Sequence, residues 1–180
     1  MGLVELGLLL KEQGRVAAPI PLMHSAGIAA LAIAEFGNDE LKSRVLRPIA
    51  SGETIVTAAL TAGSSFDPTR PNVQATKSGD DYILNGSCPC VAALPVSDAV
   101  LVPASTDEGV GLFLVQISSD GVTTEAQTTT SFEAQAILNL NDVKVVSSDT
   151  LGEPTENGSQ VQWMVERSWA CICALQWGIA

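Results

Sequence analysis

The stretch VQATKSGDDYILNG, residues 73–86, decides the fold class. Two short runs of strand-forming residues, Val73–Lys77 and Tyr82–Asn85, are separated by Ser78-Gly79-Asp80, and Asn85-Gly86 is a second turn signal. Similar short runs continue on both sides, at Thr54–Thr61, Ala99–Ala104, Leu112–Ile117, Val122–Gln127, Ala136–Leu140 and Val143–Val146. Many short strands divided by turn residues predict a mostly antiparallel β-barrel or sandwich, which we assign to residues 53–152.

Residues 1–52 show helical spacing instead. Val4, Leu8 and Lys11 share one face of a first helix, and Leu22–Phe36 is an apolar, alanine-rich second one. Asn38 is a good N-cap for a third helix, which we expect to stop near Gly52. These residues predict a partial helical N-terminal domain.

Residues 153–180 predict one more helix, which begins near Gly158. Its last part, Trp169–Ala180, is apolar on nearly every side. Such a helix must be buried all round, and we expect nothing else in the chain to surround it. Either the polypeptide is truncated or a partner covers this helix. We favour truncation and interpret the helix as the start of a C-terminal helical bundle in a chain of the α+β class.

Composition excludes several function classes. Nine Lys and Arg against 20 Asp and Glu give a net charge of −11, which disfavours nucleic acid and anionic membrane as partners. No stretch is long enough to insert into a membrane and no targeting segment is visible, so we expect a cytoplasmic protein.

No metal or nucleophile site is predicted. The pairs Cys88/Cys90 and Cys171/Cys173 have one residue between the cysteines, whereas structural zinc sites use two to four. His24 is the single histidine, and no Gly-x-Ser-x-Gly motif accompanies it.

Six stretches in order resemble the acyl-CoA dehydrogenase family. They are FGNDE (36–40) with LRPIASGE (46–53), AALT (58–61), KSGDDYILNG (77–86), SDAVLV (97–102), NDVKVV (141–146) and LGE (151–153). The resemblance covers nearly the whole chain and implies helices, then a β-domain that supports FAD, then the first helix of a bundle.

The resemblance also implies a cofactor site. Leu60 and Thr61 match the strand that enters the family's flavin loop, and either Ser64 or Ser65 matches its serine, because the loop is one residue shorter here. Cys90 and Ala92 stand where the family has a flavin-packing aromatic residue and a small hydroxyl residue. Ala62 replaces the glutamate that follows the threonine, and Cys88 replaces a lysine.

Two functions follow from the resemblance. The first is α,β-dehydrogenation of an acyl-CoA thioester with FAD, in a homo- or hetero-oligomer that passes electrons to an electron-transfer flavoprotein. The second is a non-catalytic subunit of a hetero-oligomeric dehydrogenase whose flavin site is eroded, as Ala62, Cys90 and Ala92 indicate. No catalytic residue is assigned, since the family's carboxylate base is expected beyond residue 180 and Glu166 is not a candidate. A small β-barrel binding module unrelated to flavin is a third alternative, which the apolar last helix disfavours.

Overall fold

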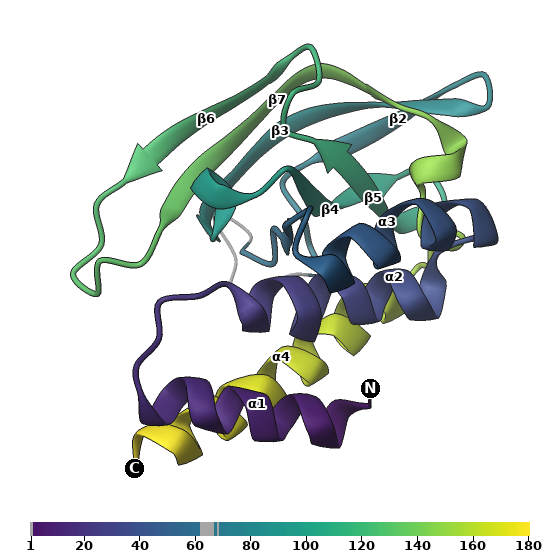
Figure 1. Ribbon diagram of the computed structural model, residues 1–180. Helices are drawn as coiled ribbons and strands as arrows, with labels where there is room; N and C mark the ends of the chain where they lie inside the picture. The colour runs from purple at the N-terminus through teal and green to yellow at the C-terminus, as the bar shows by residue number, and fades with distance from the viewer. Residues whose placement is uncertain (1, 62–66, 68) are drawn as a thin grey trace.

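The computed structural model describes residues 2–61, 67 and 69–180, in which helices from both ends of the chain lie together on one side of a sheet (Figure 1). The helices are α1 (Leu3–Arg15), α2 (Leu31–Phe36), α3 (Asp39–Ser51) and α4 (Ser159–Ile179), and a π-helical segment, Met23–Ala30, leads directly into α2. The strands are β1 (Val56–Ala58), β2 (Gln74–Ser78), β3 (Asp81–Ala92), β4 (Ala99–Thr106), β5 (Gly109–Gln116), β6 (Val122–Gln127) and β7 (Gln135–Val145). The α+β prediction is confirmed. In this part of the chain no helix is long and apolar enough to cross a membrane.

Local signals set the bounds of α3 as predicted. The Asn38 side chain accepts a hydrogen bond from the Leu41 backbone N–H at 2.8 Å, and Asp39 and Glu40 lie in the first turn, where the helix dipole favours negative charge. Gly52 closes the helix in the left-handed conformation, with φ of 77°.

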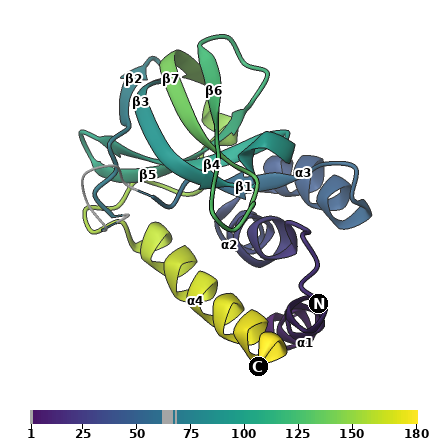
Figure 2. The same cartoon turned by 90° about the vertical axis from the view of Figure 1, so that its left-hand side faces the viewer.

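The sheet is curled and mixed (Figure 2). Its order is β1-β4-β2-β3-β7-β6, and β5 pairs with β4. Four pairs are antiparallel, namely β2–β3, β3–β7, β4–β5 and β6–β7. The expectation of a mostly antiparallel sheet is met, and the two parallel pairs are both at β4, because β1 and β2 run parallel to it.

Pro103 explains why β1 and β2 are separate strands along one edge of β4. On that edge Ala59 N–H donates to the Leu101 carbonyl at 2.8 Å, and Ser105 N–H donates to the Val73 carbonyl at 2.8 Å. Backbone groups of alternate residues face the same edge, so the nitrogen of Pro103, which has no hydrogen, faces the gap between these two bonds. The expected strand over residues 54–61 is accordingly short, and the chain leaves the sheet after Ala59.

One predicted turn and one predicted break between strands are irregularities inside long strands. Asn85-Gly86 lies within β3, where the pairing with β7 shifts register, and Gly86 has φ of 142°. A Cβ atom there would lie 2.8 Å from backbone atoms of Asn72 and Val73, so glycine permits a close chain crossing. Asp142 has φ of 53° in β7, and its backbone N–H and carboxylate bond the Asn85 side chain at 2.8 and 3.0 Å. The two expected strands at 136–140 and 143–146 are therefore one.

Apolar residues fill both faces of the central strands. Inside the curl, the rings of Tyr82 and Phe113 pack edge to face with centroids 4.9 Å apart. On the other face, Leu101, Leu112 and Leu114 contact the helical residues, including Ile33, Leu41 and Met164. Burial on both faces explains the unbroken apolar runs of β4 and β5.

Helix α1 covers one side of α4, which corrects the expectation that nothing else in the chain surrounds the last helix (Figures 1 and 2). Leu6 and Leu10 of α1 are buried with Cys171 of α4, so the chain itself covers part of the last helix. The buried face of α1 also includes Gly14, whereas Val4 and Leu8, from the face singled out in the sequence, are exposed. On α4, Trp169, Ile172, Trp177 and Ile179 remain exposed.

Candidate functional site

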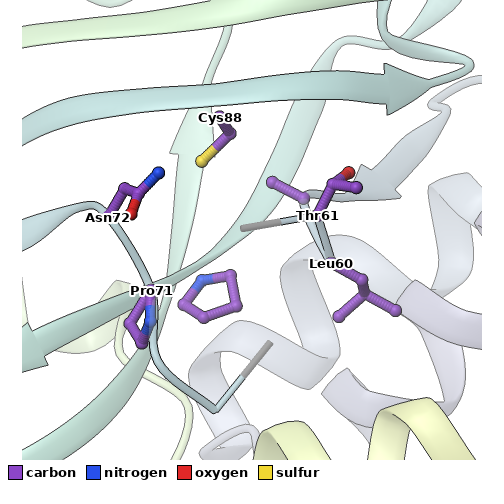
Figure 3. Close-up of a pocket in the computed structure, with 7 residues that line it drawn as sticks. Leu60, Thr61, Pro71, Asn72 and Cys88 are labelled. Atoms are coloured by element: carbon purple, nitrogen blue, oxygen red, sulfur yellow. The ribbon is translucent and has the colours of Figure 1, made fainter. Parts of the chain in front are cut away.

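The gap beside Pro103 forms the first part of the candidate site. A cavity of about 10 Å³, the size of one water molecule, is lined by Leu60, Thr61, Cys88 and Pro103, with Ala59, Pro71 and Asn72. In Figure 3 the Cys88 sulfur is directed into the space between Asn72, Pro71 and Thr61. The predicted residues Leu60 and Thr61 thus lie together, and the cysteine beside them in this cavity is Cys88.

Thr61 and Cys90 are joined by a hydrogen bond. The Thr61 hydroxyl donates to the Cys90 carbonyl oxygen at 3.2 Å, although the residues are 29 apart in sequence. Cys90 is exposed and has φ of 57°, a left-handed conformation that few residues other than glycine adopt. Its backbone N–H donates to Oε1 of Gln127 at 3.2 Å.

Ala92 is held in a similar way from β1. The buried Thr57 hydroxyl donates to the Ala92 carbonyl at 2.7 Å. The structure therefore brings together Leu60, Thr61, Cys90 and Ala92 of the predicted set. Ser64 and Ser65, together with Ala62, lie outside the described residues.

The two cysteines of β3 differ in chemistry. Burial raises the pKa of the Cys88 thiol to about 12, so it is a neutral, unreactive group at physiological pH. Cys90, in contrast, is an exposed residue. Neither has a disulfide partner, and within the described ranges no group of three or more His, Cys, Asp or Glu residues could hold a metal ion.

A second, ligand-sized cavity of about 640 Å³ lies where the helices meet the end of β3. Its wall comes mainly from four places: the end of α1 and the connector (Gln13, Gly14, Ala17, Ala18, Pro19, Ile20 and Pro21), Met23 and His24 of the π-helical segment, the β6–β7 loop (Ser131–Ala134), and α4 (Ile172, Leu175 and Ile179). Ile55, Ala93 and Val96 complete it. Ala93 connects it to the first part of the site, since its N–H donates to the Ala134 carbonyl at 2.7 Å.

One pair of titratable side chains lies in this wall. His24 Nε2 is 3.2 Å from Glu133 Oε1, and the pair connects the π-helical segment to the β6–β7 loop. An apolar cavity with a few polar groups is typical of sites for small organic ligands. Glu166 is not part of this wall. On α4 its carboxylate accepts hydrogen bonds from Gln162 at 3.2 Å and from Arg167 at 3.3 Å.

These features fit a flavin in part. Thr61 offers a hydroxyl, and the Cys90 and Ala92 backbone is fixed beside it, so polar atoms for a ring edge are present. The thiol of Cys90 and the methyl of Ala92 supply neither an aromatic face nor a hydroxyl.

Sequence reasoning missed several residues of the site. Gln127 and Glu133 reach it from strand and loop positions far along the chain, and Pro71 and Asn72 return to it after β1. The sequence signal that existed was Pro103, whose missing N–H interrupts an otherwise apolar strand.

Comparison with known proteins identifies relatives along the whole chain. Residues 1–53 match the family described as "Acyl-CoA dehydrogenase, N-terminal domain". Acyl-CoA dehydrogenase FadE27 of Mycobacterium tuberculosis is 36% identical over 151 residues, which are 84% of this chain and 39% of that protein. Cyclohex-1-ene-1-carbonyl-CoA dehydrogenase of Geobacter metallireducens is 33% identical over 68% of this chain and 34% of its own length.

Solved structures show the same arrangement. The ChsE4-ChsE5 complex from Mycobacterium tuberculosis contains a chain that is 33% identical with a TM-score of 0.90, over 98% of this chain and 46% of that one. Glutaryl-CoA dehydrogenase from Mycobacterium smegmatis is 28% identical with a TM-score of 0.90, over 99% and 47%. The chain therefore spans less than half the length of these relatives.

Proposed function

Because the chain belongs to the acyl-CoA dehydrogenase family, we propose that it contributes to α,β-dehydrogenation of an acyl-CoA thioester with FAD. Residues 1–52, 53–152 and 153–180 then belong to the helical N-terminal domain, the middle β-domain and the C-terminal bundle. A cytoplasmic location and an electron-transfer flavoprotein as electron acceptor complete the proposal. FAD, when bound, supplies the acceptor for the hydride that leaves the substrate.

The observation that carries this proposal is the contact between Thr61 and Cys90. The resemblance expects both residues beside the flavin, and the fold joins them by a hydrogen bond next to a cavity. In the proposed complex, Thr61 and the fixed backbone at Cys90 and Ala92 hold the polar edge of the ring. The larger cavity at Ala93 receives the acyl group, since its wall is mostly apolar.

Proton abstraction is assigned outside these residues. Glu166 is 52% exposed at its side chain and is engaged by Arg167. The role of this chain is therefore to bind and orient the ligands rather than to move the substrate proton.

The test is a flavin titration of the full protein, followed by absorbance and fluorescence quenching. Thr61→Val removes the hydroxyl but keeps the shape, and should weaken FAD binding by about 5- to 150-fold, the factor for one unpaired polar group. Thr124→Val, at an exposed position on β6, is the matched control and should bind FAD as the wild type does. Unchanged affinity in Thr61→Val would contradict the site assignment.

A specific observation favours the non-catalytic subunit as a second candidate. Cys90 and Ala92 lack the aromatic face and the hydroxyl that the resemblance expects, and a related structure is named as a complex of two polypeptides, ChsE4 and ChsE5. For this chain we infer a second, related polypeptide as the partner in that case.

The double variant Cys90→Trp, Ala92→Ser separates the two candidates. If the flavin site is eroded, the double variant should bind FAD more tightly than the wild type, which should bind it weakly with or without the partner. Tight wild-type binding that the double variant does not improve would refute the eroded-site hypothesis.

A further inference from the structure

The peptide backbone of Cys90 is held from two directions. Its N–H donates to Gln127 Oε1 at 3.2 Å and its carbonyl accepts from the Thr61 hydroxyl at 3.2 Å. The residue lies where the pairing of β3 with β7 is interrupted, between Cys88 and Val91. Ladder hydrogen bonds therefore do not hold it, and a residue with φ of 57° needs support from its surroundings.

Gln127 is well placed to give that support. It is the last residue of β6 and is the register partner of Gln135 on β7. Gln135 Nε2 donates to the same Oε1 atom at 3.2 Å, so the orientation of the Gln127 amide is fixed. Strand β6 does not neighbour β3, and the side chain reaches past β7 to the interrupted segment.

We propose that Gln127 is a positioning residue for the candidate cofactor site. It fixes the Cys90 peptide, and the Cys90 carbonyl in turn orients the hydroxyl of Thr61. This inference rests on the proposed function for its effect on FAD, but the hold of Gln127 on Cys90 is independent of any ligand.

Two substitutions of Gln127 separate positioning from general stability. Gln127→Met keeps the length of the side chain and removes the acceptor oxygen. Gln127→Glu retains an acceptor for both the Cys90 N–H and the Gln135 amide. Asn139→Ala is the matched control, because the Asn139 side chain donates to Glu125 Oε1 at 3.0 Å and so connects the same two strands by a hydrogen bond in which Cys90 takes no part.

The first measurement is amide hydrogen exchange of the Cys90 N–H by NMR on the full protein. Gln127→Met should accelerate this exchange by about 3- to 12-fold, the factor for one neutral hydrogen bond, and Gln127→Glu should restore protection. Unchanged exchange in Gln127→Met, or equal acceleration in Asn139→Ala, would overturn the proposal.

The second measurement is the FAD dissociation constant of the same variants. Gln127→Met should raise it by about 3- to 12-fold, while Gln127→Glu and Asn139→Ala stay close to the wild type. An unchanged constant in Gln127→Met would overturn the positioning role. If the wild type binds no FAD but exchange at Cys90 still responds to Gln127→Met, the proposed function fails. The hydrogen bond by which Gln127 fixes the Cys90 peptide is supported in that case.

Discussion

Substituting Gly14 by alanine should force α1 and α4 apart. A Cβ atom at Gly14 would overlap the carbonyl oxygen of Leu175 and would lie 3.3 Å from the Cα of Gly178. Both are backbone atoms, which cannot turn aside as a flexible side chain could. The helices must therefore separate by roughly 1 Å or more to restore ordinary contact distances.

The cost follows from what this contact buries. Leu6 and Leu10 are 2% and 0% exposed, and full burial of a leucine stabilises a fold by about 1.5–3 kcal/mol. Losing about half of that for both residues costs about 1.5–3 kcal/mol, and the better helix propensity of alanine returns about 0.5 kcal/mol. Gly14→Ala should therefore lower the free energy of unfolding by about 1–2.5 kcal/mol.

Gly7 provides the matched control in the same helix. Its added Cβ would meet only the Cβ of Ala174 at 3.8 Å, an ordinary contact, so Gly7→Ala should raise stability by about 0.5–1 kcal/mol. Urea unfolding followed by circular dichroism measures both, and thermal unfolding should show a decrease of about 2–10 °C for Gly14→Ala. If Gly14→Ala is as stable as Gly7→Ala, the reasoning is refuted, because α1 and α4 then do not need a glycine at position 14 to approach each other.

Three further predictions concern single groups. Cys90 should react with a thiol reagent at pH 8 within minutes, whereas Cys88, with a pKa raised to about 12 by burial, should react only on unfolding; mass spectrometry of digested protein checks this. Thr57→Val should lower the free energy of unfolding by about 1–3 kcal/mol in urea titrations, because it leaves the carbonyl oxygen that Thr57 now bonds without a partner. The hydrogen bond from Lys144 lowers the pKa of Asp81 in the folded chain. The ionised Asp81 therefore stabilises the fold above its ordinary pKa, and this stabilisation is lost as the pH falls through the lowered pKa of the folded chain. Lys144→Met should raise the Asp81 pKa measured by NMR.

Much of the fold could be predicted because local signals agree with it. The Asn38 cap and the Gly52 stop each act within one helix turn, so α3 was predictable from residues 38–52 alone. The dipeptide Asn85-Gly86 has the composition of a hairpin turn, yet it lies within β3. Its glycine is needed for a chain crossing with residues 72–73, and a contact of that kind leaves no local trace in the sequence.

The candidate site was predictable only in part, for the same reason. Thr61 and Cys90 were found through resemblance, but the support of Cys90 by Gln127 depends on the order of β3, β7 and β6 in the sheet. The buried face of α1 was not predictable from its own residues, because Leu8 and Leu10 are equally apolar, and the choice between them depends on Gly14 and its partner helix.

The pairing of α1 with α4 also constrains how the chain folds as it is made. Helix α1 is synthesised before its packing partner α4, and the contact joins residues that are far apart in the sequence (Figure 1). At a translation rate of about 5–20 residues per second, α4 is synthesised roughly 7–30 s after α1. During this interval Leu6 and Leu10, which are buried in the folded chain, lack their partner on α4, and α1 can dock on α4 only after the interval has ended.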